Sequence, residues 1–207
     1  MGGERRPAPA APPPVPRRQR GGGVSRVWAE ESLRLFVACP LPREVERAVA
    51  AWQHDELEGR DEVRVSRNPH ITLVFLGDVD RRRLPAVTAA IAAVRFAPIT
   101  VSFSAPRFLP PRGPARVVAL GVDDPSGALR ALQRDLALRL AATGVHKPEK
   151  RPYLPHVTVA RYRRPGERFS LQNVTVPEYC LDRVVLYSSL LERAGAVHTP
   201  IADFPAT

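Results

Sequence analysis

The chain has 207 residues, of which 44% are hydrophobic and 25% charged, and its formal net charge is +10. This composition is ordinary for a soluble globular protein of one sizeable domain or two small packed lobes. No apolar run reaches the length of a membrane span, and no apolar segment follows the basic N-terminus as in a secretory signal, so we expect a cytoplasmic protein. In that reducing compartment, we expect Cys39 and Cys180 to be buried free thiols rather than a disulfide.

Residues 1–28 differ in composition from the rest of the chain. The first 26 residues hold six arginines, six prolines and one acidic residue. Such a segment buries too little apolar surface to fold, so we expect a disordered arm ahead of a folded domain at residues 29–207. The charge of the arm suits a polyanion. The alternative is a dispensable tail or an over-extended start site.

From residue 33 onward, extended and helical patterns follow one another. In chain order they predict a strand at 33–39, a helix at 41–53, extended runs at 63–67 and 71–77, a helix at about 82–94, strands at 99–105 and 115–123, a helix at 125–144, and extended runs at 156–162, 180–190 and 196–204. The helix at 125–144 is the clearest, with Asp124 or Ser126 able to cap it and Gly144 at its end. The elements lack regular βαβ alternation, so we expect an α+β fold with a mostly antiparallel sheet.

Two of the extended runs begin with the same pattern, Pro-His-apolar-Thr-apolar. It occurs in "NPHITLVFLGD" at residues 68–78 and again in "LPHVTVARYRR" at 154–164. Because side chains alternate along a strand, each histidine should share a face with its threonine. The same alternation assigns Val74 and Ala160 to the histidine faces and Phe75 to a core.

Two histidine–threonine pairs that meet across a cleft suit proton transfer at phosphorus. One neutral imidazole can accept a proton while a charged one donates, and threonine hydroxyls can hold phosphate oxygens. No carboxylate or cysteine recurs at a spacing that would complete a metal shell, and no phosphate-binding loop for a nucleotide is present, so we expect no metal and no cofactor. The other three histidines, His54, His146 and His198, lack the motif, and we expect them to be structural.

The paired motifs "HITL" and "HVTV" resemble those of the 2H phosphoesterase superfamily. The contexts "NPHITLVFLGDV", "RPYLPHVTVARY" and "SLLERAGAVHTPIADFP" are similar to its RNA 2',3'-cyclic phosphodiesterase branch, also called the 2'-5' RNA ligase family, over about residues 33–205. The resemblance implies a bilobal α+β fold in which two antiparallel sheets surround a central cleft, with pseudo-symmetric lobes and helices on the outside. It also implies metal-independent opening of a 2',3'-cyclic phosphate at an RNA end to a 2'-phosphate. ATP-independent ligation would be the corresponding step with an RNA 5'-hydroxyl replacing water.

The resemblance assigns roles to individual residues. His70 and His156 correspond to the acid–base pair, with His156 activating water. Thr72 and Thr158 correspond to the phosphate-holding hydroxyls.

Three further residues are candidates for the cleft. Arg161 is the natural charge stabiliser, although plain alternation directs it away from His156 unless the strand bends. Tyr153 and Arg151 are expected at the cleft rim. Small aliphatic residues, Val118 and Ala119, stand where many relatives have an aromatic that stacks on a base.

The expected partner is RNA with a 2',3'-cyclic phosphate end, and the protein is expected to be a monomer that does not bind membranes. Two alternatives stay open. One is a 2H phosphodiesterase that acts on another cyclic nucleotide or on a 2'-5'-linked oligonucleotide. The other is a non-catalytic RNA-binding module with the same fold.

Overall fold

The computed structural model of the chain describes residues 31–192 and 195–207. Its elements are β1 (Ser32–Pro40), α1 (Arg43–Leu57), β2 (Val63–Val65), β3 (His70–Asp80), the 3₁₀ turn η2 (Arg81–Arg83), α2 (Leu84–Ala92), β4 (Ile99–Leu109), β5 (Ala115–Asp123), α3 (Ala128–Ala142), β6 (His156–Gly166), β7 (Tyr179–Leu181), β8 (Arg183–Glu192) and β9 (Gly195–Pro205). The expected arm lies outside the described residues. Its boundary and the division into two pseudo-symmetric lobes stay predictions.

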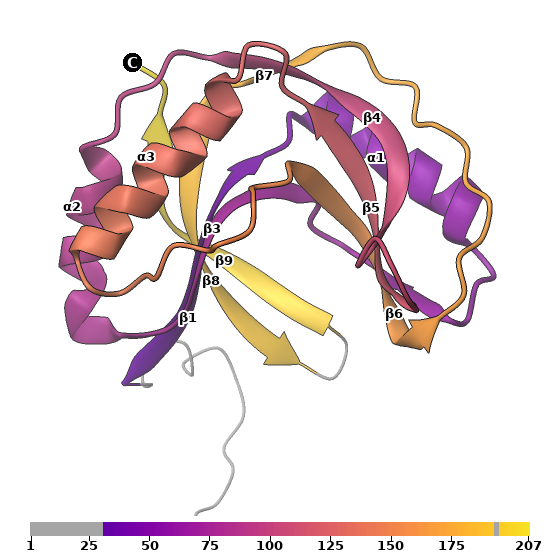
Figure 1. The fold of residues 1–207 in the computed structure, drawn as a ribbon, viewed down its shortest axis with the longest axis horizontal. Helices are drawn as coiled ribbons and strands as arrows, with labels where there is room; N and C mark the ends of the chain where they lie inside the picture. Colours follow the sequence, from indigo (N-terminus) through magenta and orange to yellow (C-terminus); the bar gives the residue numbers. More distant parts are fainter. Residues whose placement is uncertain (1–30, 193–194) are drawn as a thin grey trace, which may run out of the picture.

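The strands form a curled antiparallel sheet in the order β7-β4-β5-β6-β3-β1-β8-β9, and β2 pairs with β6 at the side of this path (Figure 1). The two halves of the sheet are joined where β3 meets β6, through the single pair Ile71 and Val157. The expected α+β fold, with antiparallel sheets curled round a centre, is confirmed.

Two of the expected elements are each divided into two in the structure. The run at 180–190 is two strands, because after Asp182 the chain leaves β4, the partner of β7, and pairs as β8 with β1 and β9. The helix expected at 82–94 is a 3₁₀ turn followed by the shorter α2.

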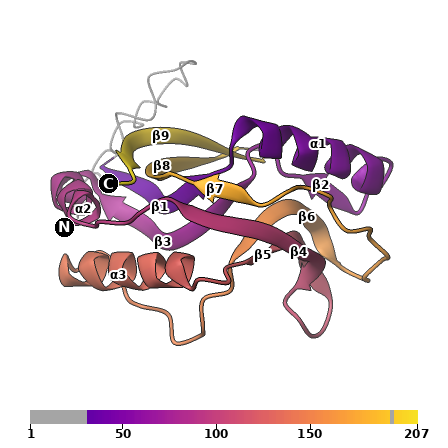
Figure 2. The ribbon, with the colours of Figure 1, turned by 90° about the horizontal axis from the view of Figure 1, so that it is seen from above.

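The helices pack on the outside of the sheet, with α2 and α3 at one end of the molecule and α1 at the other (Figures 1 and 2). The buried Asp124 carboxylate caps α3, because it accepts hydrogen bonds from the backbone N–H groups of Leu129 and Arg130 at 3.2 and 3.0 Å. One face of each helix is buried against the sheet, and this burial holds the helix in place. The buried residues of the three helices include Val45, Val49, Trp52, Leu57, Val87, Ile91, Leu129, Leu132, Leu136 and Leu140.

Strands β3 and β6 carry a bulge at the same place in their shared motif. Opposite β5, the partners Ala119 and Val118 face Thr158 and Ala160, so Val159 is an extra residue in β6. Opposite β1, Leu73 is the extra residue in β3 in the same way. A bulge shifts the alternation of side chains by one residue.

Plain alternation therefore predicts the wrong direction for three side chains. Val74 and Ala160 do not share a face with the histidines, because each follows the bulge and is buried. Phe75 does not face the core, and 46% of its surface is exposed. The strand bends at the bulge, and the residues beyond it change faces.

A side chain of α1 holds the bulge in β6. The Gln53 Nε2 group is buried and donates to the carbonyl oxygens of Val159 at 2.7 Å and Ser66 at 3.0 Å. The Val159 oxygen also accepts from the Ser66 N–H at 2.8 Å. The amide of Gln53 thus joins α1, the bulge and the segment that follows β2.

Both cysteines are free, as expected, but only Cys39 is buried; Cys180 is exposed on the edge strand β7, so its expected burial is wrong. Among the helices of the described residues, none is long and apolar enough to cross a membrane.

Substitution Gln53→Leu should lower the free energy of unfolding by about 1–3 kcal/mol, because it removes a buried donor from the buried Val159 carbonyl oxygen and the part-buried Ser66 carbonyl oxygen. Urea denaturation measures this. Asp55→Leu, an exposed polar residue on the same helix, is the matched control and should change stability by less than about 0.5 kcal/mol. Equal effects of the two substitutions would contradict a role for Gln53 in holding the bulge.

Candidate active site

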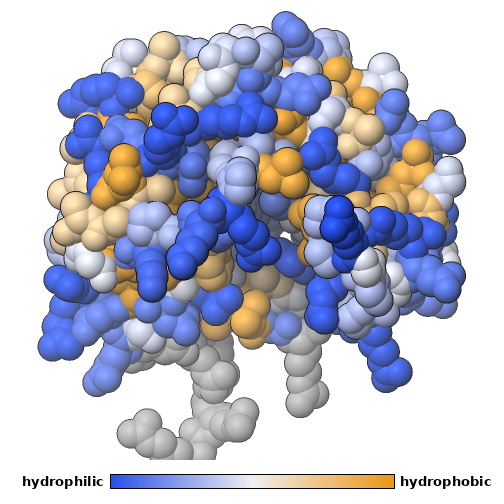
Figure 3. Space-filling model, in the orientation of Figure 1, coloured by the Kyte–Doolittle hydropathy of each residue, from blue (hydrophilic) through white to orange (hydrophobic). Residues whose placement is uncertain are grey.

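A cleft of about 750 Å³ lies between the two halves of the sheet. Figure 3 shows hydrophilic side chains around a hollow near the middle of this face. Four of the predicted site residues line the cleft: His70, Thr72, Thr158 and Arg161. His156 is not among the lining residues, but its charge acts on His70 across the junction of β3 and β6.

The pair Ile71 and Val157 explains how the two motifs come together. Both side chains are completely buried, so they point into the core. In an antiparallel pair, the flanking residues lie opposite one another on the other face, with Cβ atoms about 4.5–5.5 Å apart. His70 therefore lies across from Thr158, and Thr72 lies across from His156.

The residue two before each histidine fixes the orientation of the imidazole. Nδ1 of His70 lies 2.8 Å from the Asn68 carbonyl oxygen, and Nδ1 of His156 lies 2.8 Å from the Leu154 carbonyl oxygen. A carbonyl oxygen only accepts, so in the neutral ring the proton resides on Nδ1 and Nε2 stays free to accept another. The intervening proline favours the extended backbone of the residue before it, whose carbonyl reaches the ring. This contact accounts for the repeated Pro-His pattern.

Tyr153 contacts the first motif, at Thr72, and does not line the cleft. Its hydroxyl donates to the Thr72 carbonyl oxygen at 2.9 Å, and burial raises the pKa of Tyr153, which keeps the hydroxyl protonated. Tyr153 and Arg151, both expected at the rim, are not among the residues that line the cleft; Arg151 is exposed. Nothing in the residue pattern indicated that Tyr153 would hold β3.

Arg161 reaches the cleft because of the bulge at Val159. Plain alternation directs it away from His156, but the extra residue returns it to the face that carries His156 and Thr158. Its positive charge acts on both His70 and His198. From the sequence, Arg161 was expected to reach the site only if the strand bends. The bulge supplies that bend.

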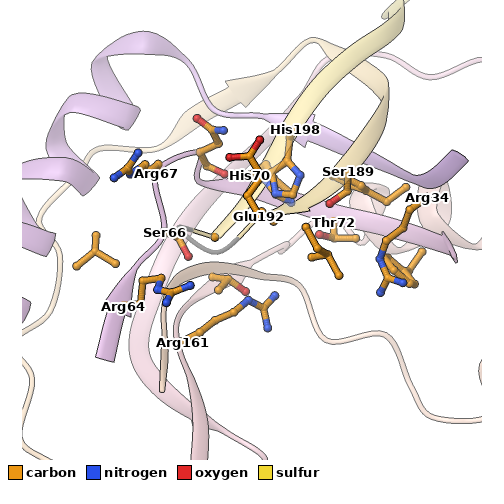
Figure 4. A pocket seen from close by; sticks show the side chains of 18 of the residues that line it. Arg34, Arg64, Ser66, Arg67, His70, Thr72, Arg161, Ser189, Glu192 and His198 are labelled. Atoms are coloured by element: carbon orange, nitrogen blue, oxygen red, sulfur yellow. Dashed lines mark hydrogen bonds between the residues drawn. The ribbon is translucent and has the colours of Figure 1, made fainter. Parts of the chain in front are cut away.

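His198, which we expected to be structural, lies beside His70 in the cleft (Figure 4). The two rings meet edge to face with centroids 5.3 Å apart, and Phe36 stacks on His70 at 5.0 Å. Nδ1 of His198 is buried and has no hydrogen-bond partner among the described residues. His198 belongs to β9, which reaches the site only through its pairing with β8. In the sequence, the one sign that His198 belongs to the site was its position in a segment that resembles the family.

The environment of His70 opposes its protonation. Burial is the main cause that lowers the pKa of His70 to about 4, and the positive charges of His198, Arg161 and His156 add to it. The hydrogen bond to Asn68 acts in the opposite direction. Burial and Arg161 also lower the pKa of His198. At neutral pH the cleft therefore holds a neutral His70 and His198 beside a cationic Arg161.

Metal binding has no evident site in the part of the chain that the structure describes. No group of three or more histidine, cysteine, aspartate or glutamate side chains comes together there in a way that could hold an ion. Metal independence stays a prediction.

Comparisons with known proteins agree on one family. The model of the 2'-5' RNA ligase superfamily matches residues 41–184. A Methanothermobacter thermautotrophicus protein named RNA 2',3'-cyclic phosphodiesterase is 32% identical over 184 residues, which cover 83% of this chain and 98% of that protein. A Geobacillus stearothermophilus protein of the same name is 29% identical over 180 residues, 82% of this chain, but the chain spans only 56% of its length.

A solved structure shares the fold. The crystal structure of E. coli LigT complexed with 3'-AMP is similar with a TM-score of 0.75 and 26% sequence identity. The similarity covers 86% of this chain and 99% of that one.

An NMR titration of the histidine rings should give a pKa of about 4 for His70 in the ligand-free protein. Substitution His198→Phe should raise that pKa, because it removes a charge that opposes protonation but keeps an aromatic ring against His70. His70→Asn identifies the resonance, and His54→Phe, at an exposed position of α1, is the matched control. A His70 that titrates near 6.5 in both wild type and His198→Phe would contradict this description of the site.

Proposed function

Because the chain belongs to the 2'-5' RNA ligase superfamily, we propose that it hydrolyses RNA 2',3'-cyclic phosphate ends to 2'-phosphates by acid–base catalysis between His70 and His156. The observation that carries this proposal is the shared geometry of the two histidines. Each donates Nδ1–H to the carbonyl oxygen two residues before it and keeps Nε2 for a proton in transit. A protein that only bound RNA would not require two imidazoles oriented in this way.

In the proposed reaction, water attacks the phosphorus and the bond from phosphorus to O3' breaks. One histidine takes a proton from the water and the other gives a proton to O3', so the products are a 2'-phosphate and a free 3'-hydroxyl. Thr72 and Thr158 donate hydrogen bonds to the non-bridging oxygens. Arg161 stabilises the negative charge that develops on them. With an RNA 5'-hydroxyl attacking the phosphorus in place of water, the same step would break the bond to O3' and join two ends through a 2'-5' linkage without ATP.

The two histidines take different roles. We assign His156 to the base that activates water and His70 to the acid that protonates O3'. Because its pKa is about 4, His70 is neutral at pH 7 and must take up a proton when the phosphate anion binds. The anion supplies the attraction for that proton, because its charge offsets that of Arg161. The NMR titration described above, repeated with a 2'-phosphate product bound, should show a raised pKa for His70.

The charge of the cleft favours RNA over the smaller substrates that the sequence left open. Its lining includes Arg34, Arg64, Arg67, Arg161 and Arg163. One cyclic phosphate carries a single negative charge and needs one arginine at most. A cleft with this many guanidinium groups is better matched to a strand with several phosphates.

Substitution of either His70 or His156 by alanine should lower turnover of an oligonucleotide with a 2',3'-cyclic phosphate end by at least about a hundredfold. The double variant should lose little more, because both groups act in one event. Thr72→Val and Thr158→Val should cost less than either histidine. Product termini are identified by mass spectrometry, with His54→Ala on the outside of α1 as control. Near-full turnover in both single variants would exclude this mechanism.

Turnover should also survive a chelator and require no nucleoside triphosphate, because the proposed proton transfers and charge stabilisation use only side chains of this chain. The measurement is the rate of cyclic-phosphate opening after dialysis against EDTA. Loss of activity that a divalent cation restores would show that the proposal of a metal-independent reaction is wrong.

A further inference from the structure

The cleft continues past the histidines toward β2. A second hollow of about 530 Å³ adjoins it there, and the two share Arg64, Arg67 and Arg163 as lining residues. Figure 4 shows Arg64, Arg67 and Arg161 on one side of the pocket and Arg34 on the other. We call the group of Arg64, Arg67 and Arg163 the β2 arginines.

These arginines have few partners within the protein. In the described part of the chain, no carboxylate lies within ion-pair distance of Arg64 or Arg67, and the Nε group of Arg163 donates to the Asp61 carbonyl oxygen at 2.9 Å. Glu192 also lines the cleft but forms no ion pair with any of them. At the other end, Arg34 is already engaged, 4.0 Å from Asp78 and 4.8 Å above the ring of Phe75. The free positive charge is thus concentrated on the β2 side.

Strand pairing places one of the β2 arginines directly opposite Arg161. Arg64 of β2 is the partner of Arg161 of β6 in the antiparallel register. Like charges at directly opposite positions destabilise a sheet, and no described carboxylate separates them. A bound anion at each guanidinium group would relieve this repulsion. Since Arg161 already serves the reacting phosphate in the proposed mechanism, Arg64 is placed to hold the next anionic group along the same ligand.

We propose that the β2 arginines form a subsite for the internal phosphates of a single RNA strand, on the 5' side of the reacting end. The inference rests on the proposed function and specifies its substrate as an oligonucleotide rather than a mononucleotide. Guanidinium groups bind phosphate through paired hydrogen bonds, and a phosphodiester strand presents one anion per nucleotide. The terminal cyclic phosphate occupies the site between the histidines, and the preceding phosphates lie along Arg64, Arg67 and Arg163.

The test compares two substrates with the same reacting group, a mononucleotide 2',3'-cyclic phosphate and an oligonucleotide that ends in one. In the double variant Arg64→Gln/Arg67→Gln, kcat/KM for the oligonucleotide should fall by about tenfold at low salt. The slope of log affinity against log salt should become shallower by about 0.7 for each lost phosphate contact. Turnover of the mononucleotide should stay within about twofold of wild type. Arg134→Gln, at an exposed position of α3, is the matched control for loss of one positive charge.

A binding measurement separates failure of this inference from failure of the proposed function. The probe is a single-stranded RNA with an ordinary 3'-hydroxyl, which the protein cannot open, titrated against wild type and variants by fluorescence anisotropy. Weaker binding and a shallower salt slope in the double variant support the subsite even if no cyclic end is turned over. Unchanged binding and slope, or equal losses for mononucleotide and oligonucleotide, would overturn it. Preference for an acidic peptide over RNA at equal charge would overturn it as well.

Discussion

The site depends on one backbone pairing, that of Ile71 with Val157. It is the only residue pair that joins β3 to β6 in the described sheet, and through it one half of the sheet meets the other. Burial of these two side chains sets which face of each strand points to the cleft, and the antiparallel register sets which residues lie opposite. Because the hydrophobic effect fixes the two apolar residues, the polar residues on either side of them need no further contact to come together.

The sequence was sufficient for the general arrangement because the pattern was repeated. Two copies of the same histidine–threonine motif predicted a shared cleft, and a strong apolar face with capping residues predicted α3. The side-chain directions beyond the threonines were not predictable, since the bulges at Leu73 and Val159 carry no glycine or other mark in the sequence. The bulges arise where β3 pairs with β1 and β6 pairs with β5, and the amide of Gln53 from α1 holds the bulge in β6.

His198 was missed for a related reason. It approaches His70 across three strand pairings, β9 with β8, β8 with β1 and β1 with β3, and none of these registers can be read from residue patterns. The electrostatics of the site follow from that arrangement. Desolvation, with a smaller contribution from the charge of Arg161, keeps His70 neutral, while Arg64, Arg67 and Arg161 have no carboxylate partner among the described residues. The protein thus retains local repulsion that an anionic ligand would relieve.

Each histidine–threonine motif is held by a hydrogen bond from a side chain in the other half of the chain, and we call these two side chains, Gln53 and Tyr153, the clamps. Gln53, from the first half, holds the bulge of the second motif, and Tyr153, which precedes the second motif, holds Thr72 of the first. Each motif is therefore held in shape by a residue from the other half of the chain. If the halves arose from an ancestral duplication, they have since lost their modularity, because neither half now contains both a motif and the clamp that shapes it. A fragment cut between them would be an incomplete structure rather than a smaller enzyme, and exchange of one half with a relative would have to carry a compatible clamp.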